Sequence, residues 1–236
     1  MEGKNVTVDQ YTTGSLDDEV DKEDRKTVRQ WYQSLCRQLA KKNDFILHGK
    51  SCVICEKTDI DLIFSISFFY TAASLIVDIA MQPLYVKAVG LNCNCGARIN
   101  HFPPKAGGLC YRKSRLQSDM TFIEDRLEDS VIPLISSINS TQDFINFLET
   151  NPKTPFICLD SFCYTYIAYS YLKIEEYAKA EKVLVELIRY FAERGYSHDL
   201  SQHHELLACV KEKRYDEVKA ILEANAKFTR EKCGLK

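Results

Sequence analysis

The chain has 236 residues, which is long enough to bury a sizeable core in one domain or in two small ones. Its hydrophobic fraction of 45% and charged fraction of 27% are ordinary values for a globular protein and exclude wholesale disorder. Lys and Arg together number 31 against 33 for Asp and Glu, which gives a net charge of -2. Because phosphate binding depends on clustered positive charge, this balance argues against a nucleic-acid partner and leaves a protein partner open.

The first residues, 1–6, lack the apolar core of a signal peptide and lead into the acidic stretch 17–21. We therefore expect no standard export signal and a cytoplasmic location. The ten cysteines would then lie in a reducing compartment, where free thiols behave as small buried hydrophobic groups rather than as a disulfide framework.

One uncharged run, 62–77, has sixteen residues and raises the question of a membrane span. A spanning helix needs about 20 predominantly apolar residues. This run is shorter, contains Ser65 and Ser67, and alternates with a period of two. It predicts strands, and we expect no membrane partner.

The N-terminal part begins with a predicted helix. Ser15-Leu16-Asp17-Asp18 has the Ser-x-x-acid pattern of a helix start, and Asn43-Asp44 is typical of a helix end. A helix from about Asp17 to Lys42 would place on one face an apolar stripe made of Val28, Trp31, Tyr32, Leu35 and Leu39.

From Phe45 onward the hydrophobic period changes from 3.6 to 2, which predicts strands. The segments 45–48 and 52–55 flank Gly49-Lys50-Ser51, a pattern typical of a hairpin. In the next strand Phe64, Ile66 and Phe68 would share a buried face, with Ser65 and Ser67 opposite.

The alternation resumes at 75–81, and Pro83 should end that strand or place it at an edge. The segments 85–91 and 93–99 could add a fifth strand. Strands this close in sequence predict an antiparallel β-meander with the first helix packed on one face, and hence an α+β fold.

An irregular stretch, 102–118, separates the sheet from a helical remainder and is either a functional loop or a linker. It carries the basic cluster Arg112, Lys113 and Arg115, which could contact an acidic partner, although three charges in a loop are more often solvated. We predict a helix-plus-sheet domain over 1–118 and an all-helical segment over 119–236, packed together as one unit.

Small Ala168 and Ala180, in the stretch 166–180 near the C-terminus, would allow two helices to approach closely. The same stretch has an apolar-small pair, a first-helix aromatic, a turn aromatic and a second-helix small residue at Ile167, Ala168, Tyr171, Tyr177 and Ala180. With these residues the stretch resembles a tetratricopeptide repeat, whose first positions are a Leu-Gly pair. The resemblance implies a protein-binding surface.

A second unit follows, because Tyr177 recurs thirty-eight residues later as Tyr215, and Val218 stands where Ala180 stood. This spacing exceeds the usual length of about 34 residues, and stable arrays generally need three or more units. We therefore predict a helical cap on the sheet domain, with plain antiparallel helices as the alternative. The sheet-plus-helix layout also resembles small uncharacterised bacterial α+β domains, some of which are immunity partners of toxins.

Four cysteines suggest a metal site. Cys52, Cys55, Cys93 and Cys95 could hold zinc tetrahedrally, but the odd offset between Cys52 and Cys55 points them to opposite faces of a strand. The even offset of Cys93 and Cys95 aligns their thiols. The pair His203-His204 is interpreted as surface or cap histidines, because adjacent helix residues diverge by about 100°. We expect no metal and no cofactor.

The sequence thus favours a non-enzymatic protein-binding module, with an immunity or regulatory partner as one possibility and the oligomeric state left open. Six tyrosines lie between Tyr164 and Tyr190, more than a two-helix core of this size needs, and tyrosine is enriched at interface hot spots. The candidate protein-binding residues are Tyr166, Tyr169 and Tyr177. The alternative is a small metal-binding protein or enzyme that uses the Cys93/Cys95 region.

Overall fold

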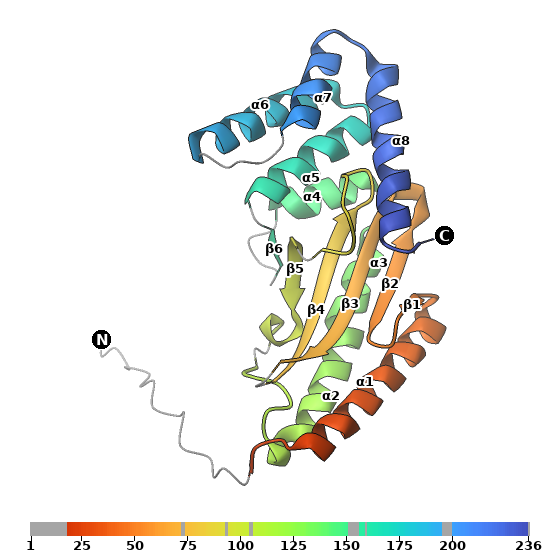
Figure 1. Cartoon of the computed structure of the whole chain (residues 1–236), viewed down its shortest axis with the longest axis vertical. Helices are drawn as coiled ribbons and strands as arrows, with labels where there is room; N and C mark the ends of the chain where they lie inside the picture. Colours follow the sequence, from red (N-terminus) through yellow and green to blue (C-terminus); the bar gives the residue numbers. More distant parts are fainter. Residues whose placement is uncertain are drawn as a thin grey trace, which may run out of the picture.

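The computed structural model describes residues 18–71, 74–92, 94–103, 106–150, 156–158, 160–194 and 200–235. A helix, a sheet and then a run of helices follow one another along the chain, and the later helices stack at one end of the sheet (Figure 1). The predicted α+β class is confirmed. The helices are α1 (Lys22–Asn43), α2 (Leu116–Arg126), a π-helical turn (Leu127–Val131), α3 (Ile132–Ser137), α4 (Thr141–Thr150), α5 (Asp160–Lys173), α6 (Tyr177–Arg194), α7 (Ser201–Lys211) and α8 (Tyr215–Lys232).

The sheet is an antiparallel meander with the strand order β1-β2-β3-β4-β5-β6. Its strands are β1 (Ile46–His48), β2 (Cys52–Lys57), β3 (Leu62–Tyr70), β4 (Leu75–Pro83), β5 (Cys95–Arg98) and β6 (Ile157–Cys158). The first hairpin, the two long strands and the strand end at Pro83 agree with the predictions. Strand β6 was not predicted, because two residues are too short to produce an alternating pattern. It pairs with β5, so the described part of 119–236 contains this strand beside its helices.

The predicted strand at 85–91 is wrong. These residues form an irregular connection between β4 and β5. The chain turns directly after β4, where the Leu84 amide donates to the Asp61 carbonyl oxygen at 2.7 Å and the Val86 amide donates to the Pro83 carbonyl oxygen at 3.4 Å. Tyr85 is buried against the helices instead of joining the sheet, whereas Val89 is exposed.

Strand β3 is buried on both faces. Phe64, Ile66 and Phe68 lie in the main core together with side chains of α1 and of the later helices, as predicted. Ile63, on the opposite face, belongs to a second core cluster with Cys52, Ile54, Leu84, Ala226, Cys233 and Leu235. Burial on both sides explains why the run 62–77 is free of charge. None of the helices in the described ranges is long and apolar enough to cross a membrane.

Helix α1 begins about five residues later than predicted. Its N-cap is Asp21, whose Oδ1 accepts hydrogen bonds from the amides of Glu23 at 2.8 Å and Asp24 at 3.0 Å. The Asp24 carboxylate accepts from the Asp21 amide in return at 3.1 Å, which completes a capping box. The predicted cap, Ser15, lies outside the described residues. The helix ends at Asp44, as expected, in a left-handed conformation with φ of 56°.

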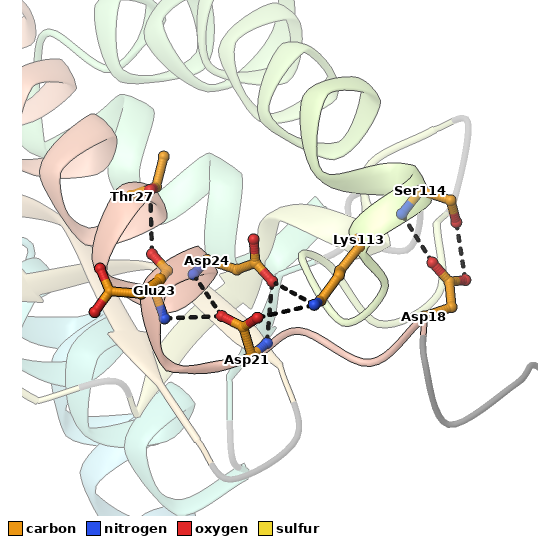
Figure 2. A network of polar contacts seen from close by, with 7 residues as sticks. All are labelled: Asp18, Asp21, Glu23, Asp24, Thr27, Lys113 and Ser114. Atoms are coloured by element: carbon orange, nitrogen blue, oxygen red, sulfur yellow. Dashed lines mark hydrogen bonds and ion pairs between the residues drawn. The ribbon is translucent and has the colours of Figure 1, made fainter.

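The start of α1 is tied to the segment that precedes α2 (Figure 2). Lys113 Nζ lies 2.8 Å from Asp21 Oδ2 and 3.6 Å from Asp24 Oδ2. Ser114 donates to Asp18 from both its amide and its hydroxyl, each at 2.9 Å. We call these contacts the N-terminal clasp, because they fasten two segments that are more than 90 residues apart in sequence.

Asp18 of the clasp and Asp119 of α2 neutralise the other two residues of the basic cluster of the 102–118 stretch. Arg112 Nη1 lies 3.5 Å from Asp18 Oδ2, and Arg115 Nη2 lies 2.9 Å from Asp119 Oδ1. Together with Lys113 in the clasp, each of the three basic residues has an acidic partner within the chain. An acidic partner protein would have to compete with these ion pairs.

The two C-terminal helical hairpins, α5–α6 and α7–α8, share one turn geometry at an offset of 38 residues. The turns contain left-handed residues, Glu175 with φ of 63° and Lys213 with φ of 58°. The next amide in each turn donates five residues back, from Glu176 to Tyr171 at 2.9 Å and from Arg214 to Cys209 at 2.8 Å. The rings of Tyr177 and Tyr215, which follow the turns, stack with centroids 3.9 Å apart. The repetition noticed in the sequence is therefore a repetition of backbone structure.

The buried face of β3 gives the first prediction. Replacement of Ile66 by Asp should abolish soluble expression, because an unpaired buried charge costs several kcal/mol against a total stability of about 5–15 kcal/mol. Ile66 is fully enclosed between Val53 of β2 and Ile79 of β4. The matched control is Phe69→Asp on the same strand, whose side chain is exposed. A folded Ile66→Asp protein with an unchanged Tm would contradict the assignment.

The clasp gives the second prediction. The hydrogen bond from Lys113 lowers the pKa of Asp21 from 3.8 to about 2, and the amides of Asp24 and Glu23 contribute. Because this pKa is lower in the folded than in the unfolded chain, Asp21 stabilises the fold above pH 3.8, and the stabilisation is lost as the pH falls toward 2. An NMR titration should place the Asp21 midpoint near 2 in the wild type and move it toward 3.8 in Lys113→Met. A wild-type midpoint already at 3.8 would contradict the clasp.

Candidate protein-binding groove

The connection between β4 and β5, which we call the β4–β5 loop (residues 84–92), leaves the sheet and lies against the helices (Figure 1). Its first part is anchored by Tyr85, which is buried. The Tyr85 hydroxyl lies 2.7 Å from Ser170 Oγ on α5, and its carbonyl oxygen accepts from Asn225 Nδ2 on α8 at 3.1 Å. The loop is thus attached to two helices at one residue.

The rest of the loop is held through its backbone by two buried side chains. Thr229 Oγ1 accepts from the Ala88 amide at 3.0 Å and donates to the Val86 carbonyl oxygen at 3.2 Å. Gln82, near the end of β4, donates to the Gly90 carbonyl oxygen at 3.1 Å and accepts from the Asn92 amide at 2.9 Å. These bonds satisfy partly buried backbone groups that have no strand partner, so they fix an irregular conformation.

The residues that hold the loop replace apolar residues of the first hairpin. At the offset of 38, Asn225 and Thr229 correspond to Leu187 and Phe191, which pack in the main core. All four side chains are buried. The second hairpin therefore carries hydrogen-bonding groups at the positions where the first carries hydrophobic ones. The polar residues Asn225 and Thr229, at positions where the first hairpin has apolar residues, are the sequence signal that could have predicted the contact between α8 and the loop.

Two adjoining cavities, of about 480 and 680 Å³, lie along the β4–β5 loop and share Val86, Lys87 and Phe162 as walls. Both volumes are in the range typical of ligand-binding pockets. We call the two together the α5 groove. The smaller cavity is also lined by Ser161, Thr165, Tyr169, Phe191, Ser201, Gln202, His203 and Glu205, and the larger by Gln82, Tyr166, Asn92, Asn94 and further loop residues.

The base of the groove is formed by two buried tyrosines of α5. The Tyr169 hydroxyl lies 3.0 Å from His203 Nδ1 and donates to Gln202 Oε1 at 3.3 Å. The Tyr166 hydroxyl donates to Asn92 Oδ1 at 3.1 Å. Burial raises the pKa of both hydroxyls well above the ordinary value, so they stay protonated and act as donors. Both rings are thereby fixed before any ligand arrives.

The three tyrosines predicted to bind a partner do not form one surface. Tyr166 and Tyr169 line the groove but expose almost no side-chain area. Tyr177 is half-buried at the hairpin turn, where it stacks on Tyr215 and does not line either cavity. Their role in binding stays a prediction.

Sequence reasoning missed the more accessible residues of the groove, notably Lys87 and Phe162. It missed Lys87 because the loop was interpreted as a strand, whose residues would pair with the sheet. It missed Phe162 because a single aromatic residue at a helix start has no periodic signal. His203, interpreted as a surface or cap histidine, is half-buried and packs edge-on against Tyr169 with ring centroids 5.6 Å apart.

The cysteines of the metal hypothesis are separated. Cys52 belongs to the second core cluster and Cys55 packs against the main core, so their side chains point to opposite faces of β2. Cys95 is fully buried and lies opposite Cys158 in the β5–β6 pair. Cys93 lies outside the described residues, and within the described ranges no three metal-binding side chains come together.

Comparison of the chain with protein-family models, curated proteins and solved structures gives no significant match. The tetratricopeptide-like and immunity-like resemblances therefore rest on the residues quoted for them above. Any function has to be argued from the groove itself.

The attachment of the loop gives the third prediction. In Thr229→Val the shape of the side chain is kept, but the Ala88 amide and the Val86 carbonyl lose their partner. Loss of a hydrogen bond of about 1 kcal/mol should speed hydrogen exchange at Ala88 by roughly five- to tenfold. The matched control is Thr165→Val, whose hydroxyl donates only within α5, to the Ser161 carbonyl oxygen. Unchanged exchange at Ala88 in Thr229→Val would show that the loop is held by other means.

Proposed function

We propose that this chain is a non-enzymatic protein-binding module whose α5 groove holds an extended segment of a partner protein. The observation that carries the proposal is the pair of adjoining cavities beside a loop whose backbone is already fixed. A preformed site loses little conformational entropy on binding, so its contacts contribute more fully to affinity.

The shape of the groove supports an extended ligand. The two cavities adjoin along the β4–β5 loop and share three wall residues, so one continuous ligand chain can occupy both. The lining combines the aromatic rings of Phe162 and Phe191 with a single lysine, Lys87, and a single glutamate, Glu205. Aromatic anchors with a few polar groups are typical of peptide recognition.

The helices also hold one irregular segment already, which is the chain's own β4–β5 loop. Asn225 and Thr229 contact its backbone atoms rather than its side chains, so this contact depends on chain direction and not on side-chain identity. A partner segment lying beside the loop would meet Lys87 and Phe162, which form the shared walls. A partner of protein nature also agrees with the tetratricopeptide-like resemblance and with the cytoplasmic location that we propose.

The alternative, a metal-binding protein or enzyme that uses Cys93 and Cys95, stays a prediction. Nothing in the described geometry favours it, because Cys95 is enclosed in the sheet. The groove offers a histidine, His203, but its Nδ1 is engaged by the Tyr169 hydroxyl. We therefore assign His203 to the base of the binding groove.

The fourth prediction tests the groove with a library of random linear peptides. Peptides selected on the purified chain should bind Phe162→Ala roughly 30-fold more weakly, which corresponds to the loss of about 2 kcal/mol at an aromatic hot spot. Lys87→Glu, at an exposed position, should also change the affinity of charged peptides. Isothermal titration calorimetry on the selected sequences measures both effects.

The matched control is Phe69→Ala, which removes an exposed aromatic ring at the far end of β3 and should leave peptide binding unchanged. A circular dichroism melt of each variant separates lost binding from lost structure. Peptides that bind Phe162→Ala and Lys87→Glu as well as the wild type, or a library that yields no binder, would refute the groove as a peptide site.

A further inference from the structure

Cys95 of β5 and Cys158 of β6 lie directly opposite each other in the sheet, whereas Cys52 and Cys55 of β2 face other residue types. Directly opposite residues of an antiparallel pair have Cα atoms about 4.5 or 5.5 Å apart, depending on whether the two residues exchange hydrogen bonds. A disulfide requires about 4.4–6.8 Å between the same atoms. The strand register therefore places Cys95 and Cys158 within the range of a disulfide in either case.

The two side chains also lie on the same face of the sheet, as directly opposite residues do. Cys95 is part of the main core, and Cys158 packs against that core. Tyr166 on α5 lies near both of them. Burial raises the pKa of the Tyr166 hydroxyl, and electrostatic interaction with Cys95 and with Cys158 raises it further. Two thiols thus share one side of the sheet, next to one tyrosine of the α5 groove.

The two thiols differ in their access to solvent. Strand β6 is the last strand of the sheet (Figure 1), and Cys158 is partly exposed there, beside Ile157, which is 64% exposed. Cys95 exposes none of its surface. A small oxidant therefore reaches Cys158 first, with Cys95 held opposite it. Redox-sensing cysteines are often accessible to solvent and lie next to a second cysteine that resolves the oxidised form.

We propose that Cys95 and Cys158 form a reversible disulfide when the protein is exposed to hydrogen peroxide. In the first step the O–O bond of the peroxide breaks, the Cys158 thiol becomes a sulfenic acid, and one water molecule leaves. In the second step the Cys95 sulfur attacks the Cys158 sulfur and the S–O bond breaks. The hydroxide that leaves takes up the Cys95 proton as a second water. A small thiol reduces the disulfide again by exchange.

The disulfide fastens the shortest strand of the sheet. Strand β6 has two residues, and Cys158 lies two positions before α5 begins at Asp160. The bond therefore fixes the chain just ahead of the helix that forms the base of the groove. It joins residues that are 63 positions apart, which reduces the entropy of the unfolded chain and should stabilise the fold. The bond forms whether or not the groove holds a peptide, so the inference is independent of the proposed function.

Peptide mapping of the full chain after peroxide treatment tests the proposal, and it is the fifth prediction. After the remaining thiols are alkylated, trypsin should release residues 88–98 linked to residues 154–173, and dithiothreitol should separate them. Each of these peptides holds a second cysteine, so fragmentation of the linked pair must place the bond between Cys95 and Cys158. A bond through another cysteine, or peptides that stay separate, overturns the proposal.

Serine variants provide the control and a second measurement. Cys158→Ser should give no linked peptides. The matched control is Cys55→Ser, which replaces a partly buried cysteine that faces Phe64 and should link as fully as the wild type. The bond should raise the Tm of the wild type by roughly 4–16 °C over the same sample treated with dithiothreitol. A link that persists in Cys158→Ser, or one that leaves the Tm unchanged, contradicts the assigned pair.

Discussion

The carboxylate of Asp61 is the point where the sheet, the helices and the β4–β5 loop meet. Its two oxygens lie 2.6 Å from Lys173 Nζ on α5 and 3.4 Å from Arg230 Nη2 on α8. Arg230 also reaches Glu56 on β2 at 2.7 Å, and the Asp61 carbonyl oxygen accepts the first amide of the loop, from Leu84. These side chains are largely shielded from water, so each charge depends on its partners for compensation. The loop contacts come from the neighbouring residue Thr229 and from Asn225, five residues before Arg230, so the ion pairs and the loop contacts share one stretch of α8.

The second helical hairpin, α7–α8, ends against the sheet and the β4–β5 loop. Here Ala226 and Cys233 pack against the sheet in the second core cluster, and Asn225 and Thr229 receive the loop. The second hairpin carries polar residues because it packs against the β4–β5 loop. Backbone groups of an irregular loop need hydrogen-bond partners from outside the loop, whereas the backbone of a helix provides its own.

Local patterns predicted the sheet well because burial on its faces is periodic in sequence. Phe64, Ile66 and Phe68 alternate with residues of the opposite face. Pro83 ends the strand because it has no backbone N–H to donate to a neighbouring strand. The conformation of the β4–β5 loop depends instead on Asn225, which follows Tyr85 by 140 residues, so no local pattern could predict it. The tyrosines of α5 indicated the region of the candidate groove, but their burial could only be known once the loop was placed over them.

The hydrogen bonds that hold the β4–β5 loop and the ion pairs of the N-terminal clasp respond differently to acid and salt. The loop is held by amides and hydroxyls, from Asn225, Thr229 and Gln82, none of which titrates near neutral pH. The N-terminal clasp is held by exposed carboxylates and Lys113, which salt screens and acid neutralises. The walls that the two cavities of the α5 groove share, Val86, Lys87 and Phe162, belong to the loop and to α5, so salt or acid that loosens the clasp acts on a different part of the molecule.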